Sequence, residues 1–109
     1  MNTKEILIAA RDLIADPARW TTARFARDEF GNELLDPSSP RAACWCARGA
    51  IQKIGGRPDK PGTPAYGAAE YLYKACVALF GKTVFLVNDG PNGHARILKA
   101  FDHAIAEAA

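Results

Sequence analysis

Residues 65–80 read AYGAAEYLYKACVALF and predict the longest helix of the chain. Thr63 and Pro64 precede this segment and predict the start of the helix. Threonine caps helix N-termini, and proline at the first helical position loses only a donor that has no partner there. Gly81 follows it and favours the left-handed backbone that ends many helices. The apolar residues recur at helical spacing and are Ala65, Ala68, Ala69, Leu72, Cys76, Leu79 and Phe80.

Three more segments predict helices around this one. Asn2 and Glu5 have the spacing of a capping box, and the apolar residues after them predict a first helix that ends at Asp16 and Pro17. Ser39 and Pro40 form the same kind of helix start and predict a second helix over residues 40–54. Gly55 and Gly56 end this predicted helix. A last helix is predicted after residue 93, with its apolar stripe at Ile97, Leu98, Phe101, Ala104, Ile105 and Ala108.

Two segments have a pattern that is not helical. Residues 22–28 and 33–36 flank Gly31 and Asn32, which can adopt the positive φ of a tight turn, and they predict a short β-hairpin. Residues 83–87, TVFLV, form a short apolar run that predicts a strand or an extended core segment. The predicted fold class is mainly α (α+β), with about four helices and a small β-hairpin in a single compact domain, residues 1–109.

The composition is that of an ordinary globular domain, with 109 residues of which 49% are hydrophobic and 24% charged. A net charge of +2 is too small to indicate nucleic acid or an acidic membrane surface as the partner. The chain has no secretory-signal pattern and no apolar run near the roughly 18 residues of a membrane span. Its three cysteines suit free thiols in a reducing compartment, so we expect a cytoplasmic protein.

Cys46 is the candidate nucleophile. In this hypothesis His94 is its base, and Asp89 or Asp102 orients the imidazole, which are the roles found in thiol hydrolases. The alternative is structural, because on a helix over residues 40–54 Cys46 points inward, and a buried free cysteine behaves as a small hydrophobe. A place in the second turn also keeps Cys46 away from the helix N-terminus that would stabilise a thiolate. The structural alternative is the favoured one.

Metal binding is not predicted. His94 and His103 are nine residues apart, which places them about 180° apart around one helix. Cys44 and Cys46 are two residues apart and would lie on different sides of a helix, whereas zinc sites prefer wider spacings. The glycines form no phosphate-binding motif, and no cofactor is expected.

His94 falls on the apolar stripe of the last helix. A histidine in such a place is usually a core residue whose ring nitrogens bond to a carboxylate or to a backbone carbonyl. Asn88 and Asp89 lie in the preceding loop, and such side chains readily bond nearby backbone amides. We predict a buried polar network that joins this loop to the second helix.

Basic residues are frequent in the first half of the chain, and two tryptophans lie among them. Such a mixture can line a groove for a nucleic-acid strand. Acidic residues are interleaved with the basic ones, however, and this favours a solvated surface of mixed charge. If this surface binds a partner, the candidate residues are Trp20, Trp45 and Arg48.

Several short motifs follow one another along the chain: Trp20, then Phe25-Ala26-Arg27-Asp28 and Gly31, then Trp45-Cys46-x-x-Gly49-Ala50, then Asn88-Asp89, and finally His94 with Phe101-Asp102-x-Ala104-Ile105. Together they resemble a small bacterial and phage domain family of unknown function. The resemblance spans nearly the whole chain. It implies a compact, stand-alone cytoplasmic domain and brings no activity, cofactor or partner.

The leading functional hypothesis rests on what the sequence lacks, namely a complete catalytic constellation, metal-ligand spacing and strong charge. It is a non-enzymatic accessory domain that binds or regulates a protein partner. The alternative is a small cysteine-dependent hydrolase or transferase that uses Cys46 and His94. We expect an unidentified protein partner and neither nucleic acid nor a membrane, and we leave a homo-oligomer open.

Overall fold

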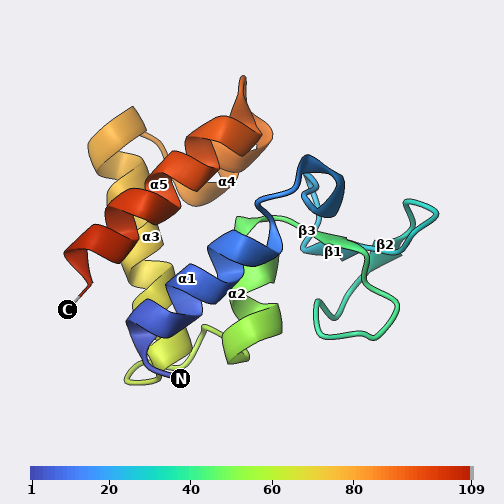
Figure 1. Cartoon of the computed structure of the whole chain (residues 1–109), viewed down its shortest axis with the longest axis horizontal. Coiled ribbons are helices and arrows are strands. Elements are labelled where there is room, and N and C mark those ends of the chain that lie inside the picture. Colours follow the sequence, from blue (N-terminus) through green and yellow to red (C-terminus); the bar gives the residue numbers. More distant parts are fainter. Residues whose placement is uncertain (109) are drawn as a thin grey trace.

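A group of packed helices carries a small β-sheet at one end (Figure 1). The computed structural model describes residues 1–108. In chain order the elements are α1 (Thr3–Leu13), the short 3₁₀ helix η1 (Pro17–Arg19), β1 (Ala26–Arg27), β2 (Glu33–Leu34), β3 (Cys44–Trp45), α2 (Ala47–Gly55), α3 (Pro64–Phe80), α4 (Val84–Asp89) and α5 (Gly93–Glu107). The predicted fold class, mainly α with a small β element, is confirmed.

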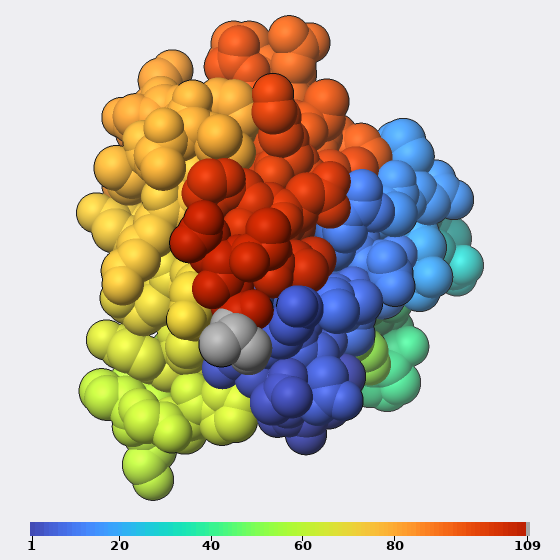
Figure 2. Space-filling model, turned by 60° about the vertical axis from the view of Figure 1, so that its left-hand side comes forward, coloured from blue at the N-terminus to red at the C-terminus, as the bar shows by residue number. Residues whose placement is uncertain are grey.

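The helices share one apolar core. α5 packs against both α1 and α3, and Figure 2 shows its surface between the surfaces of these two helices. α2 packs on α1 and α3, while α4 packs on α3 and α5. Burying each large apolar side chain contributes about 1.5–3 kcal/mol. The largest fully buried apolar side chains are Leu7, Ile14, Ile51, Leu72, Ile97 and Phe101. No helix within residues 1–108 has the length and apolar character needed to cross a membrane.

The predicted N-terminus of α1 and both predicted ends of α3 are confirmed, whereas α1 ends at Leu13, before the predicted Asp16 and Pro17. The side chain of Asn2 accepts a hydrogen bond from the backbone N–H of Glu5, and the carboxylate of Glu5 accepts one from the backbone N–H of Asn2. The hydroxyl of Thr63 accepts a bond from the backbone of Tyr66 at the start of α3. Gly81 ends α3 with φ 66°, in the left-handed region that glycine adopts most easily.

The predicted hairpin is present but short. β1 pairs with β2 in antiparallel register, with Ala26 opposite Leu34. β1 also pairs with β3, where Ala26 lies opposite Trp45, so the sheet order is β2-β1-β3. Each strand is two residues long, and the third strand was not predicted from the sequence.

The prediction of a helix over residues 40–54 is wrong in its first half. Residues 44 and 45 form β3, and the backbone N–H groups of Ala43 and Cys46 donate to the carbonyls of Arg27 and Phe25. This pairing with β1 satisfies the backbone in an extended form, and the Ser39-Pro40 segment makes only a turn. The helix therefore begins at Ala47. Cys46 is its N-cap and does not lie in its second turn.

The prediction of a strand or extended segment over residues 83–87 is also wrong, because Thr83 is the N-cap of α4 and residues 84–87 lie in this helix. Val87 and Asn88 are both buried, whereas Phe85 and Leu86 are exposed. Neighbouring positions of a strand point to opposite faces, so an extended backbone could not bury two consecutive side chains on one side. Packing of α4 on α3 and α5 decides the conformation over local β propensity.

Candidate functional site

Asn88, at the end of α4, is the centre of a buried polar network and is 1% exposed. Its Oδ1 accepts hydrogen bonds from Nε1 of Trp20 at 3.0 Å and from the backbone N–H of Ala47 at 3.1 Å. Its Nδ2 donates to the carbonyl oxygen of Thr21 at 3.1 Å and to Oδ1 of Asp89 at 2.9 Å. The amide thus uses two acceptor and two donor positions. The predicted network with the second helix is confirmed, but Asn88 and Asp89 lie in α4 and not in a loop as predicted.

Asp89 extends the network towards the surface. Its Oδ1 also accepts a bond from the backbone N–H of Ala23 at 3.1 Å. Ala23 has φ 66°, a conformation that residues other than glycine rarely adopt. The contact with Asp89 therefore helps to hold the segment between η1 and β1 in this unusual form.

Cys46 caps α2 through its sulfur, which accepts a hydrogen bond from the backbone N–H of Gly49 at 3.3 Å. The residue is 4% exposed. Burial raises the pKa of its thiol, and the charge of Asp89 adds to this rise, while hydrogen bonds from the backbone of Gly49 and Arg48 oppose it in part. Burial outweighs these hydrogen bonds, and Cys46 is a neutral thiol at neutral pH.

His94 and Asp102 bond to groups other than Cys46. Nε2 of His94 lies 2.7 Å from the carbonyl oxygen of Ile14. A carbonyl oxygen only accepts hydrogen bonds, so Nε2 carries the proton. The carboxylate of Asp102 binds the guanidinium of Arg11, with 2.6 Å between Nε and Oδ1. Within residues 1–108, no hydrogen bond joins Cys46, His94 and Asp102 to one another.

The ring of His94 packs against Trp20, with 5.2 Å between the ring centroids and 55° between the planes. The contact of its Nε2 with the carbonyl oxygen of Ile14 confirms the expectation that this histidine bonds to a backbone carbonyl. Trp20 is half-buried and is held at its indole N–H by Asn88. Trp45 is 3% exposed and donates from Nε1 to the carbonyl oxygen of Pro37 at 2.8 Å, which makes it a core residue.

Gly49 allows α2 to approach the sheet closely. A Cβ atom at this position would lie 1.9 Å from the carbonyl oxygen of Phe25, which also accepts the backbone N–H of Cys46. Ala50 has no exposed surface. The Trp-Cys-x-x-Gly-Ala motif therefore forms the joint between β3 and α2: Trp45 pairs in the sheet, Cys46 caps the helix and Gly49 permits the contact.

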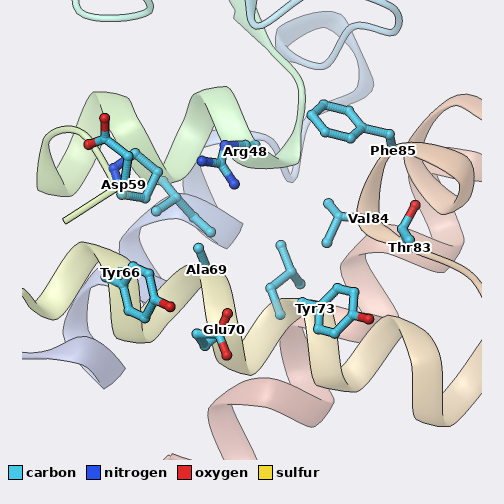
Figure 3. A pocket seen from close by; sticks show the side chains of 12 residues that line it. Arg48, Asp59, Tyr66, Ala69, Glu70, Tyr73, Thr83, Val84 and Phe85 are labelled. Carbon is cyan, nitrogen blue, oxygen red and sulfur yellow. The ribbon is translucent and has the colours of Figure 1, made fainter. Parts of the chain in front are cut away.

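Two clefts open on the surface beside this joint. The α3 cleft has a volume of about 390 Å³ and lies between α2, α3 and α4 (Figure 3). The β cleft has a volume of about 280 Å³ and lies between the hairpin and the N-terminus of α2, where Cys46 and Asp89 line it. Phe85 lines both clefts, so they adjoin each other at α4.

Exposed aromatic side chains lie along these clefts. Phe85 is 50% exposed and packs against Phe25, which is 38% exposed, with 6.3 Å between ring centroids. Tyr73 projects from α3 into the α3 cleft, and Leu35 lines the β cleft beside Phe25. We call the three aromatic residues Phe25, Tyr73 and Phe85, together with the aliphatic Leu35, the aromatic face. In the part of the chain that the structure covers, no three His, Cys, Asp or Glu side chains are placed to hold a metal ion.

A family model of unknown function, DUF6197, matches residues 1–107. The chain belongs to the DUF6197 family. No curated protein and no solved structure gave a significant match to it. Membership in this family brings no activity or ligand.

Most residues that line the two clefts were not predicted from the sequence as binding residues. Arg48 was among the predicted binding residues and does line the α3 cleft. Phe25, Tyr73 and Phe85 were not among the predicted binding residues. Phe85 was missed because the run that contains it was not recognised as a helix. Had α4 been placed, the helical spacing of Val84, Val87 and Asn88 would have turned Phe85 outward.

Proposed function

We propose that this DUF6197 domain is a non-enzymatic module that binds a protein partner through the aromatic face. The observation that carries the proposal is the contact between Phe25 and Phe85, two half-exposed phenylalanines from distant segments that meet where the two clefts adjoin. Single exposed apolar residues are common on proteins, but a contiguous group beside a cleft is typical of an interaction site. Aromatic residues also dominate the energetics of protein interfaces.

The charges beside the clefts support a protein partner over nucleic acid. Arg24 lies at the β cleft, where it is paired with Glu33, and Asp89 lines the same cleft. Asp59 and Glu70 line the α3 cleft. Nucleic-acid sites have a consistent excess of positive charge, whereas charges of both signs line these two clefts.

A cysteine-dependent hydrolase or transferase is the second candidate, and one observation favours it. Cys46 lies at the N-terminus of α2 and lines the β cleft, and a helix N-terminus favours a thiolate. Against it, burial raises the pKa of this thiol, and the Nε2 proton of His94 is engaged by Ile14. A general base needs to lie within hydrogen-bond reach of its nucleophile. The binding module therefore remains the leading proposal.

Site-specific photo-crosslinking tests the binding function. A benzophenone amino acid replaces Tyr73 in the α3 cleft, and the captured protein is identified, purified and titrated against the unlabelled domain. We expect Phe85→Ser to weaken this binding about tenfold or more, since central aromatic residues are the usual interface hot spots. Phe30→Ser is the matched control, because Phe30 is 81% exposed at the tip of the hairpin and lines neither cleft. Equal binding by both variants, or no captured protein that binds when purified, would overturn the proposal.

A further inference from the structure

Arg48 differs from the other half-buried arginines of the domain, which are Arg11, Arg27 and Arg96. It lies in the first turn of α2, is half-buried and lines the α3 cleft, yet it has no ion pair, hydrogen bond or aromatic partner for its guanidinium within residues 1–108. The exposed Arg41 likewise has no such partner. The remaining arginines bond to carboxylates, carbonyls or a hydroxyl, or lie over aromatic rings: Arg11, Arg19, Arg24, Arg27, Arg57 and Arg96.

The guanidinium of Arg48 is directed into an open cleft. Figure 3 shows it projecting from α2 towards α3, across from Ala69 and Glu70. No buried side-chain nitrogen or oxygen of the described residues lacks a hydrogen-bond partner, so the nitrogens of Arg48 keep access to solvent in the cleft. An unpaired guanidinium in a partly desolvated cleft favours a carboxylate or a phosphate, which it binds through two parallel N–H groups.

The surroundings favour a single carboxylate. Asp59 is paired with Arg57, and Glu70 lines the cleft without an ion pair among residues 1–108. Glu70 repels any anion in the cleft, and it repels a dianionic phosphate about twice as strongly as a single carboxylate. Ile51 and Leu72 are buried residues that line the cleft, and Tyr73 and Phe85 are exposed residues that line it (Figure 3). A carboxylate bound by Arg48 would thus have room for an apolar side chain beside it.

The shape of the site favours a chain segment over a compact small molecule. The α3 cleft and the β cleft share Phe85 in their linings, and Phe25 and Leu35 line the β cleft beyond it. An extended peptide can follow both clefts, with alternate side chains in each, as in other peptide-binding grooves.

We propose that the partner inserts a short peptide segment with one carboxylate and an adjacent large apolar side chain, and that Arg48 binds the carboxylate in the α3 cleft. This inference rests on the proposed function and names the chemistry of its partner. The carboxylate belongs to an aspartate, a glutamate or the C-terminus of the segment.

A random-peptide selection on the purified domain tests binding by the aromatic face and carboxylate binding by Arg48 separately. Two libraries are used, one with free and one with amidated C-termini, and each is selected in parallel on the wild-type domain and on Phe85→Ser. We expect peptides that depend on Phe85 and that share an acidic group next to an aromatic or large aliphatic residue. The best peptide is then synthesised with its carboxylate and with the matching neutral amide.

Titration of these two peptides against the wild-type domain and Arg48→Met gives a double-mutant cycle. We expect the amide peptide and Arg48→Met each to weaken binding about tenfold, with little further loss when they are combined, because both remove the same ion pair. Arg41→Met is the control and is expected to leave binding unchanged. Because the guanidinium of Arg48 has no partner among residues 1–108, we expect Arg48→Met to have the same melting temperature as the wild type, which separates lost binding from lost folding.

The outcomes separate the two proposals. If no peptide depends on Phe85, the proposed function fails and this inference fails with it. If the selected peptides depend on Phe85 but lack an acidic group, or bind Arg48→Met as tightly as the wild type, the aromatic face stands and the assignment of Arg48 is overturned. A charge exchange gives a direct gain of binding, since Arg48→Glu is expected to prefer the peptide in which a lysine replaces the acidic residue.

Discussion

The side-chain oxygen of Asn88 accepts a hydrogen bond from the backbone N–H of Ala47 at 3.1 Å, although 41 residues separate them in the chain. Ala47 is the first residue of α2, and its N–H is one of the donors that a helix cannot satisfy internally. The sulfur of Cys46 satisfies a second such donor, that of Gly49. Two side chains from separate elements therefore complete the start of α2 and fix its position against α4.

Replacing Asn88 removes this connection. Asn88→Ala leaves the buried N–H of Ala47, the indole N–H of Trp20 and the carbonyl of Thr21 without their partner. We expect a loss of about 2–4 kcal/mol in the free energy of unfolding, because each buried polar group left unpaired costs about 1–3 kcal/mol and the groups relax in part. Urea unfolding followed by tryptophan fluorescence measures the change.

Asn32→Ala is the matched control for Asn88→Ala. Asn32 is exposed, and among the residues that the structure describes its side chain bonds only to Asp28 within the hairpin turn. We expect a change below about 1 kcal/mol, as for most surface positions. Equal losses for the two variants would mean that the Asn88 network has no special role in stability.

Gly49→Ala tests the close contact between α2 and β1. At a helical position alanine is more favourable than glycine by about 1 kcal/mol, so helix propensity alone predicts that Gly49→Ala is more stable. The added Cβ would lie 1.9 Å from the carbonyl oxygen of Phe25, however, and that backbone is fixed by the sheet. We expect a net loss of about 2 kcal/mol or more, measured by thermal unfolding, since overpacking against backbone forces the elements apart. A gain in stability would contradict the contact.

Local signals were sufficient for the N-terminus of α1 and for both ends of α3. The capping box of Asn2 and Glu5, the Thr63-Pro64 opening and the terminal Gly81 act through neighbouring residues, so they can be recognised in the sequence. They failed where distant residues decide the conformation. Ser39 and Pro40 have the same helix-opening signal, but pairing of residues 44 and 45 with β1 keeps the chain extended until Ala47.

The candidate site was predictable only in part, for the same reason. The polar network around Asn88 was foreseen as a type of contact, because loop asparagines usually bond to backbone. Its geometry depends on Trp20, Thr21 and Ala47, which no local pattern links to Asn88. The aromatic face depends on α4, whose conformation comes from packing on α3 and α5, so Phe85 could not be placed on the surface.

Cys76 makes the stability of the domain dependent on pH in the alkaline range. It has no exposed surface, and burial raises the pKa of its thiol from 9.0 to about 11. The folded state thus holds this proton at pH values where the unfolded chain releases it, and stability falls as pH rises between these two values. From pH 7.5 to 10.5 we expect the wild type to lose about 2 kcal/mol more than Cys76→Ala, which has no proton to hold.

Urea unfolding of both proteins at the two pH values measures the difference. Titration of lysines and tyrosines affects wild type and variant alike, so only the contrast between them reports on Cys76. Parallel losses in the two proteins would show that this thiol does not contribute to the alkaline instability.

The reactivity of Cys46 separates the binding module from the thiol enzyme. Burial raises the pKa of this thiol, and alkylation requires an accessible thiolate, so we expect iodoacetamide at pH 7.5 to label Cys46 at least about tenfold more slowly in the native protein than in urea. Cys44, which is partly exposed, should react first. His94→Ala should leave the native rate at Cys46 unchanged, because His94 bonds to Ile14. Peptide mass spectrometry reads each site. Native labelling of Cys46 faster than in urea, and slowed by His94→Ala, would instead establish an activated nucleophile and make the enzyme the better description of this domain.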